Sequence, residues 1–214
     1  MKVLYYTGLR RGEALALTLH DVNMQQRKLS LNKSLDISEN TPEIKTPKTK
    51  SGFREVPIPN ELYEELKTYI KDHNSVYLFS TVKGSLPSRS SFRRMWESII
   101  KKTQNTADEI ARKEDGDKKI RLMRNTSIIF TPHLFRHTYA TNLYYAGIDV
   151  KKSQYYLGHS SIEMTLKIYT HLDNERNEQD YYDRINNFFS QSKISQNEKS
   201  CGFAEKQKPL KRSV

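Results

Sequence analysis

Four separated groups of residues combine cations, imidazoles and one hydroxyl, the side-chain types that act on phosphate esters. Charge spreads over the nonbridging oxygens when a phosphodiester is attacked, so fixed Arg and Lys donors aimed at those oxygens supply most of the catalysis. Tyrosine forms a covalent intermediate at such a centre when positive neighbours or a base assist its deprotonation. In chain order the groups are Arg10-Arg11, Lys48 with Lys50, His133 with Arg136 and His137, and His159 followed by Tyr169.

Other chemistries find little support in the same residues. His133 and His137 have the helical i, i+4 spacing of zinc proteases, but Leu134 stands where that motif needs its glutamate. Neither a GxxxxGK[ST] loop nor a GxGxxG loop is present, and Asp115 and Asp117 lie in a charged stretch typical of solvated surface. We therefore expect no metal and no cofactor.

Each candidate, taken singly, also fits a structural role. Arg10 fits a surface cation at a helix start, and Lys48 and Lys50 fit turn lysines that discourage edge pairing. His159 fits a helix cap after Gly158. Spacing alone does not show that the four groups meet in space.

The composition favours a basic protein with a polyanionic partner. The chain has 214 residues, a formal net charge of +11 and 36% hydrophobic residues. Lys and Arg facing phosphates release counterions and give salt-dependent binding. Cys201 is the only cysteine, so no intramolecular disulfide or cysteine-rich zinc site can form. No run approaches the roughly 20 apolar residues of a membrane span, and no signal peptide is present. The single cysteine fits a reducing cytoplasm, and a nucleic acid as the polyanionic partner would make the protein nucleoid-associated, so we expect a cytoplasmic, nucleoid-associated protein.

Hydrophobic periodicity predicts mainly helices, with Thr103–Ser127 as a long charged surface loop or insertion in which a helical piece stays open as an alternative. One predicted helix ends near Asp21, and another starts with a capping box of Ser160 and Glu163. The helix at 60–74 is predicted to bury Leu62, Tyr63, Leu66, Tyr69 and Ile70, and the helix at 88–102 to bury Phe92, Met95, Trp96, Ile99 and Ile100. Further helices are predicted at 133–147, 149–158, from 160 through Tyr169, and at 180–190 with Tyr182, Ile185, Phe188 and Phe189 on its apolar face.

The N-terminal third contains the strand signals. Residues 26–37 alternate apolar and polar side chains and predict one strand, while residues 43–59 predict a hairpin that turns at Ser51-Gly52. An extended arm would place Lys48 and Lys50 on one face. Residues 75–80 predict a short strand or an extended stretch. The fold class expected is mainly α with a small three-stranded antiparallel β-sheet (α+β).

Four boxes, taken together and in order, resemble the tyrosine recombinases, or phage-type integrases, and most closely those of conjugative transposons and Gram-positive phages. The boxes are "TGLRRGEALALTLHDV", "PKTKSGFREVPI", "HLFRHTYATNL" and "LGHSSIEMTLKIYTHL". The resemblance covers Val3 to Phe189 and implies the tyrosine recombinase catalytic-domain fold. We expect this domain at residues 1–190, followed by a polar, disordered tail at 191–214.

The resemblance also implies roles for individual residues. It implies that Tyr169 is the nucleophile and that a lysine protonates the departing 5′-hydroxyl. The "PKT" context favours Lys48 for that role, and Lys50 stays open as the alternative. The remaining implied roles are the two phosphate-binding arginines Arg10 and Arg136, the proton-handling His133, the phosphate-binding His159, and Glu13 as the acidic support of Arg10.

The activity implied is site-specific DNA recombination or integration through a 3′-phosphotyrosine, without a cofactor. The implied partners are double-stranded DNA at recombination sites, further copies of the chain up to a tetramer on DNA, and accessory DNA-bending proteins. The alternatives are a type IB-like topoisomerase and a non-catalytic DNA-binding remnant. Family members carry an N-terminal helical domain, whereas nine residues precede Arg10 here. We therefore expect an N-terminally truncated catalytic domain in which Val3, Leu4, Tyr5 and Tyr6 pack against little.

Overall fold

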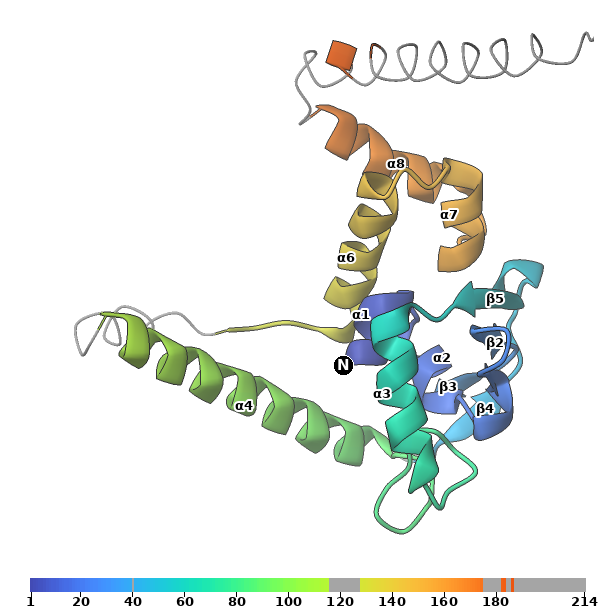
Figure 1. Cartoon of the computed structure of the whole chain (residues 1–214). Helices are drawn as coiled ribbons and strands as arrows, with labels where there is room; N and C mark the ends of the chain where they lie inside the picture. Colours follow the sequence, from blue (N-terminus) through green and yellow to red (C-terminus); the bar gives the residue numbers. More distant parts are fainter. Residues whose placement is uncertain (40, 116–127, 175–181, 184–185, 187–214) are drawn as a thin grey trace, which may run out of the picture. The chain divides into compact units, whose positions relative to one another are not determined.

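The computed structural model describes residues 1–39, 41–115, 128–174, 182–183 and 186. The chain divides into two compact units, Met1–Tyr169 and Thr170–Val214, and the division falls inside helix α8. The first unit is mostly helical with small antiparallel sheets, which confirms the expected class (Figure 1). The predicted boundary at residue 190 and the tail at 191–214 lie outside the described residues.

The described elements are numbered in chain order as in Figure 1. The α-helices are α1 (Lys2–Thr7), α2 (Arg11–Ala16), α3 (Asn60–Lys71), α4 (Arg89–Asp115), α6 (Pro132–Tyr145), α7 (Val150–Leu157) and α8 (Ile162–Asn174). The strands are β1 (Val22–Asn23), β2 (Lys28–Leu31), β3 (Ser34–Asp36), β4 (Glu43–Lys45) and β5 (Arg54–Pro57). The 3-10 turns are η1 (Leu19–Asp21) and η2 (Lys50–Gly52).

Helix α1 is part of the core rather than a loose end. Val3 and Leu4 are buried in one cluster with residues of the sheet and of α3, and α1 contacts α2, α3 and α6 (Figure 1). The expectation that these residues pack against little is therefore wrong for Val3 and Leu4 and for Tyr6, which is partly buried against the same cluster, while Tyr5 is exposed. The helix ends at Gly8, whose φ of 61° and tight contact with the Tyr139 ring leave no room for a Cβ.

Helix α2 is shorter than predicted. It ends at Ala16 because the chain becomes extended at Leu17, whose carbonyl accepts a hydrogen bond from the Leu78 amide at 2.8 Å. Leu19 donates to the Val76 carbonyl in turn, so this stretch forms a bridge with residues 75–80. The predicted helix is present, but its predicted end near Asp21 is wrong, since backbone pairing with a distant segment outweighs local helix propensity.

The three-stranded antiparallel sheet is present, but its strands differ from the prediction. Its order is β1-β2-β5, and a separate two-stranded sheet pairs β3 with β4. The single strand predicted at 26–37 is therefore two strands in two sheets, and the hairpin predicted at 43–59 does not form. Strand β4 pairs with β3 through the register Leu35↔Ile44, and the Lys45–Asp36 ion pair at 2.8 Å reinforces that choice.

Helices α3 and α4 agree in part with the sequence. Helix α3 buries Leu62 and Leu66, while Tyr69 is half exposed and donates its hydroxyl to the Leu78 carbonyl. Helix α4 buries Phe92 but leaves Met95 exposed, contrary to the prediction. It also runs to Asp115 through much of the predicted loop, whose residues 116–127 lie outside the described part of the chain.

The helices from residue 132 onward follow the predicted order. Helix α6 starts at Pro132, and the left-handed Gly147 follows its end, while α7 ends at the left-handed Gly158. Helix α8 starts after Ser161, whose hydroxyl accepts from the Glu163 amide, so the capping box expected at Ser160 is wrong. Of the apolar face predicted for 180–190, only Tyr182 is described, and it is exposed.

Candidate active site

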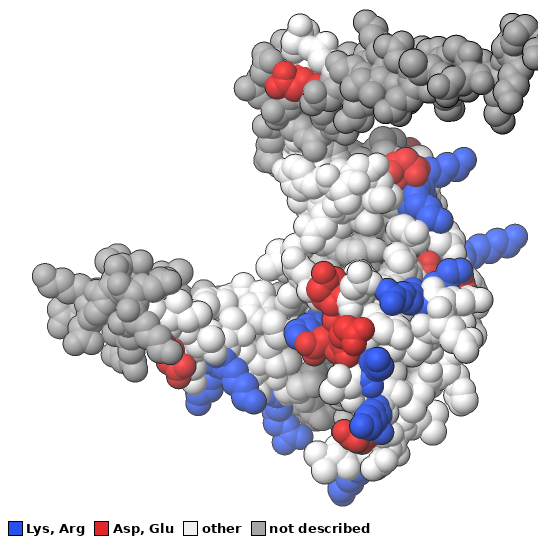
Figure 2. Space-filling model, in the orientation of Figure 1, with Lys and Arg blue, Asp and Glu red and all other residues white. Residues whose placement is uncertain are grey.

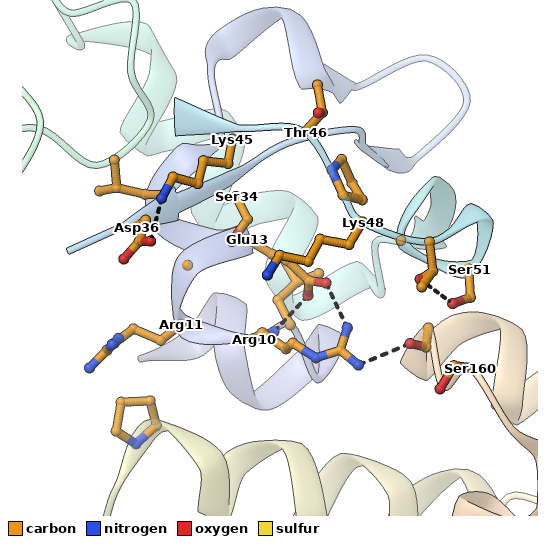
Figure 3. A pocket seen from close by; sticks show the side chains of 18 of the residues that line it. Arg10, Arg11, Glu13, Ser34, Asp36, Lys45, Thr46, Lys48, Ser51 and Ser160 are labelled. Atoms are coloured by element: carbon orange, nitrogen blue, oxygen red, sulfur yellow. Dashed lines mark hydrogen bonds and ion pairs between the residues drawn. The ribbon is translucent and has the colours of Figure 1, made fainter. Parts of the chain in front are cut away.

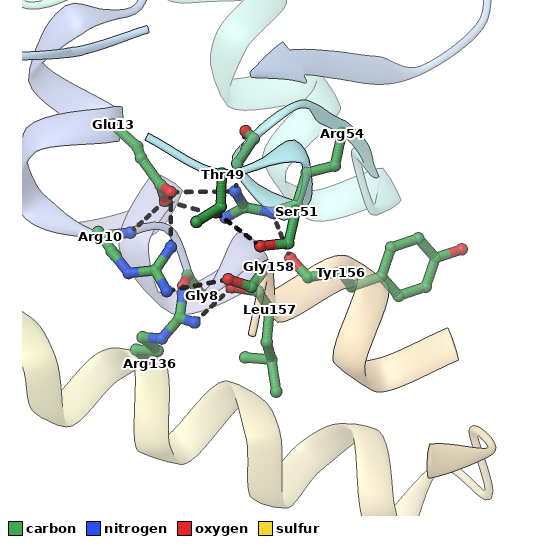
Figure 4. Close-up of polar contacts among 11 residues, drawn as sticks. Gly8, Arg10, Glu13, Thr49, Ser51, Arg54, Arg136, Tyr156, Leu157 and Gly158 are labelled. Atoms are coloured by element: carbon green, nitrogen blue, oxygen red, sulfur yellow. Dashed lines mark hydrogen bonds and ion pairs between the residues drawn. The ribbon is translucent and has the colours of Figure 1, made fainter. Parts of the chain in front are cut away.

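Arg10 and Glu13 form a pair at the start of α2. Arg10 is the N-cap, and the Glu13 carboxylate accepts from its backbone amide at 2.7 Å and from Nη1 at 2.9 Å. Arg10 Nη2 donates to the Gly158 carbonyl at 2.9 Å (Figure 4). The Arg10 side chain is 44% exposed, whereas that of Glu13 is 8% exposed. Glu13 thus holds a guanidinium that still reaches solvent, and its supporting role stays a prediction.

Arg54, which sequence reasoning missed, binds the other side of the same carboxylate. Its Nη1 and Nη2 donate to the two Glu13 oxygens at 3.0 and 2.9 Å, and Nε donates to the Tyr156 carbonyl at 2.9 Å. Burial raises the pKa of Glu13, but hydrogen bonds from Arg54 and Arg10 outweigh that effect and lower the pKa. The available signal was the alternation in "REVP", which places Arg54 and Val56 on the buried face of β5.

Arg136 lies buried on α6 beside this cluster. Its Nη1 donates to the Gly8 carbonyl at 3.0 Å, and its Nη2 donates to the Leu157 carbonyl. Burial, followed by repulsion from Arg10, lowers the pKa of Arg136 to about 9, which leaves the guanidinium charged at neutral pH. The carbonyls of residues 156, 157 and 158 at the end of α7 therefore accept from three different arginines, Arg54, Arg136 and Arg10 (Figure 4).

An open cavity of about 800 Å³ lies in front of Arg10 (Figure 3). Its walls come from the start of α2, from β3, from the segment between β4 and η2, from the start of α6, and from Gly158 and Ser160. Lys48 and His133 line it together with Arg10. The cavity therefore collects candidates from three of the four sequence groups, and its lining residues Gly158 and Ser160 flank His159 of the fourth group.

Lys48 and Lys50 occupy different places. Lys48 is among the residues that line the cavity, whereas Lys50 begins η2 and is not. The expected extended arm is interrupted by this 3-10 turn, so the two lysines do not share a strand face. Their positions favour Lys48, and its role stays a prediction.

The two histidines lie close to the arginines but differ in their surroundings. His133 stands in the first turn of α6, and its ring meets that of His137 edge to face, with centroids 4.7 Å apart. Burial, then His137 and Arg136, lower the pKa of His133. His159 is buried, its Nδ1 hydrogen-bonds Thr165 Oγ1 at 2.9 Å, and burial followed by the charge of Arg136 lowers its pKa to about 4. At neutral pH His159 is therefore uncharged.

Tyr169 does not point into the cavity. Its side chain is buried, and its hydroxyl donates to the Ile148 carbonyl at 3.0 Å and shares a 2.6 Å hydrogen bond with Ser153 Oγ. Its ring meets Tyr144 edge to face at 5.0 Å. Burial raises the pKa of Tyr169. The structure thus brings the cations and His133 together and holds the tyrosine hydroxyl on other partners.

Other features of the described residues bear on ligands. Within residues 1–39, 41–115 and 128–174, and at the few residues described beyond them, no cluster of three His, Cys, Asp or Glu side chains suits a metal ion. In that part of the chain no helix is long and apolar enough to cross a bilayer. On the face shown in Figure 2, Lys and Arg side chains follow α4 and the sheet side, with an acidic group between them.

The chain matches the phage integrase family over residues 1–176 and belongs to that family. It is 33% identical over 180 residues to the transposase of transposon Tn916 from Enterococcus faecalis, covering 79% of this chain and 40% of that protein. A XerC-like tyrosine recombinase from Caldanaerobacter subterraneus is 30% identical over 190 residues, covering 78% of this chain and 43% of that protein. The chain spans less than half the length of these curated relatives.

A solved structure shows the same fold. The Tn1549 transposon integrase (residues 82–397 of that protein), in complex with circular intermediate DNA, superposes with a TM-score of 0.61 at 29% identity, over 78% of this chain and 53% of that one. The family and the fold predicted from the four boxes are thereby confirmed.

Proposed function

We propose that this chain is the catalytic region of a site-specific DNA recombinase that cleaves and rejoins DNA through a 3′-phosphotyrosine. The observation that carries the proposal is the cavity in which Arg10, Lys48 and His133 meet, beside the buried Arg136. Relatives named as transposases and recombinases, and an integrase solved with DNA, support a DNA substrate and favour strand exchange over the topoisomerase and remnant alternatives. We further propose that the protein acts on double-stranded DNA at recombination sites, and therefore at the nucleoid in the cytoplasm. Several copies are proposed to assemble on that DNA.

The cations account for phosphate binding. Arg10 and Arg136 come from elements far apart in the chain, and both bind carbonyl oxygens at the end of α7. Guanidinium groups placed this way stabilise the charge that grows on the nonbridging oxygens of a scissile phosphate. His159 is neutral at physiological pH, so it contributes as a hydrogen-bond donor rather than as a charge.

The covalent step follows from the remaining groups. The Tyr169 oxygen forms a bond to phosphorus while the bond from phosphorus to the 5′-oxygen breaks. Lys48 gives a proton to that leaving oxygen, and His133 takes the phenol proton. A 5′-hydroxyl of a partner strand reverses the step. Tyr169 must first leave Ser153 and the Ile148 carbonyl, so chemistry requires a local rearrangement of α8.

Covalent trapping tests the proposal. The probe is a pool of duplex DNA with randomised sequence on both sides of a central 5′-bridging phosphorothiolate, whose released thiol rejoins poorly. We expect an SDS-resistant complex with the wild-type chain and none with Tyr169→Phe, while both bind duplex DNA. Tyr69→Phe is the matched control, because its hydroxyl also donates to a main-chain carbonyl at 3.0 Å.

Two results would contradict the proposal. Wild-type protein that binds the pool without covalent capture would refute the recombinase assignment. Capture by Tyr169→Phe at the wild-type level would refute Tyr169 as the nucleophile.

A further inference from the structure

The Glu13 carboxylate binds two arginines, Arg10 and Arg54, whose side chains differ in their exposure to solvent. Glu13 Oε1 accepts from Arg10 Nη1 at 2.9 Å and from Arg54 Nη1 at 3.0 Å, while Oε2 accepts from the Arg10 amide at 2.7 Å and from Arg54 Nη2 at 2.9 Å (Figure 4). Arg10 faces the cavity and is partly exposed, whereas the Arg54 side chain is 0% exposed. Only one of the two is therefore open to a ligand.

Arg54 is anchored from four elements at once. It stands on β5 in register with Leu31 of β2, and its Nη1 also lies 3.4 Å from the Gly52 carbonyl of η2. Its Nε donates to Tyr156 of α7, and both Nη atoms bind Glu13 of α2. A planar guanidinium held along two edges fixes the plane of the carboxylate that it binds, which a lysine ammonium cannot do.

We propose, given the recombinase function proposed above, that Arg54 is a positioning residue that orients the phosphate-binding Arg10 through Glu13. A half-exposed arginine ordinarily samples many rotamers, and binding a phosphate then requires ordering it. With Glu13 held by Arg54 on one side, Arg10 places Nη1 on Glu13 and Nη2 on Gly158, so its guanidinium is ordered before any ligand arrives. The same side chain ties the end of α7, which carries His159, to the turn that follows Lys48.

A purely structural ion pair gives a matched control. Lys33, in the connection between β2 and β3, binds Asp21 Oδ2 of η1 through its Nζ, and both side chains are largely buried. In the described residues neither hydrogen-bonds Arg10 or Glu13. Lys33→Met therefore removes a comparable ion pair without touching the site.

The first experiment needs no activity. In ¹⁵N spectra of arginine side chains, the two Nη nitrogens of Arg10 give separate signals if their different partners slow rotation about the Nε–Cζ bond, which exchanges the two nitrogens. We expect separate signals in the wild type and in Lys33→Met, and averaged signals in Arg54→Lys. Unchanged separation in Arg54→Lys, or averaged signals in the wild type, would overturn the proposal.

The second experiment measures covalent capture of the phosphorothiolate pool in a double-mutant cycle. We expect Arg54→Lys to lower the capture rate about tenfold or more at unchanged duplex affinity, and to lower it less than about threefold when Arg10→Lys is already present. Equal factors in both backgrounds would show that Arg54 acts independently of Arg10 and would overturn the proposal. Lys33→Met is expected to capture DNA at the wild-type rate.

Folding and function are kept apart in these tests. If Arg54→Lys does not fold, Arg54→Gln replaces it, because its amide still donates one hydrogen bond to Glu13 without a charge. Failure of both variants to fold would assign Arg54 to stability alone and overturn the positioning role. Absence of capture by the wild type refutes the recombinase function, and the ¹⁵N spectra then still decide whether Arg54 orders Arg10.

Discussion

Gly158 has a left-handed backbone conformation and also packs against Arg54, so Gly158→Ala tests the energetic cost of both features. Its φ is +63°, and an added Cβ would lie 2.6 Å from Arg54 Nη1, 2.7 Å from Arg54 Cζ and 2.9 Å from the Ser51 carbonyl oxygen. The left-handed conformation alone costs a non-glycine residue about 1–2 kcal/mol. Displacing the buried guanidinium weakens a charged hydrogen bond worth about 1.5–3 kcal/mol. We expect the free energy of unfolding to fall by about 2.5–5 kcal/mol.

Gly147→Ala isolates the two contributions. Gly147 has a φ of +71°, but nothing lies within 4 Å of an added Cβ, so only the conformational cost of about 1–2 kcal/mol applies. The entropy that alanine removes from the unfolded chain is similar in both variants and cancels in the difference. Urea unfolding followed by far-UV circular dichroism at pH 7 measures both. Equal losses for the two variants would refute the claim that Arg54 is packed tightly against the end of α7.

Three further predictions concern the site. Burial lowers the pKa of His159 from the usual 6.5 to about 4, so the unfolded chain binds this proton first and the free energy of unfolding falls as pH decreases from 6.5 to 4. Urea unfolding at pH 7 and pH 5 should show a smaller loss of that free energy in His159→Gln than in the wild type. Equal losses in the two proteins would contradict this reasoning. Lys48→Ala should slow cleavage of an ordinary nicked duplex about 10²–10⁴-fold, but it should cleave the phosphorothiolate normally, because the sulfur leaves without protonation. Lys50→Ala should cleave both substrates normally. The reverse pattern would assign the proton-donating role to Lys50. Ser153→Ala removes one of two hydrogen bonds that hold the Tyr169 hydroxyl, so stability should fall by about 1 kcal/mol while capture becomes up to about fivefold faster, and slower capture would argue against sequestration.

Helices could be predicted from the sequence where local signals agree. The helices ending near Gly147 and Gly158 combine clear periodicity with a left-handed glycine, and both end within two residues of prediction. Strand partners could not be predicted, because alternation shows which side chains share a face but not which strand lies beside it. Leu35 pairs with Ile44, and β5 pairs with β2, through long-range contacts that cannot be read from the local sequence pattern.

In the candidate site, too, the residues with a local sequence signal were predicted, whereas the contacts that depend on tertiary packing were not. Residue type and chain order were enough to select Arg10 and His133, and the family resemblance added Glu13; the structure places all three around one cavity. Arg54 was missed because an arginine in an alternating strand resembles an exposed one until its buried partner is known. The partners of the Tyr169 hydroxyl depend on how α7 and α8 pack, which is a tertiary property.

The three carbonyls at the end of α7 also set an order on biosynthesis. Arg10 can bind the Gly158 carbonyl only after a further 148 positions have been synthesised, and Arg54 can bind the Tyr156 carbonyl only after a further 102 positions. Contacts so distant in the chain form late, because the loops they close carry a high entropic cost. A nascent chain on the ribosome therefore displays unassembled basic segments until α7 emerges, and a translation product that stops before α7 carries these arginines without the carbonyls that arrange them.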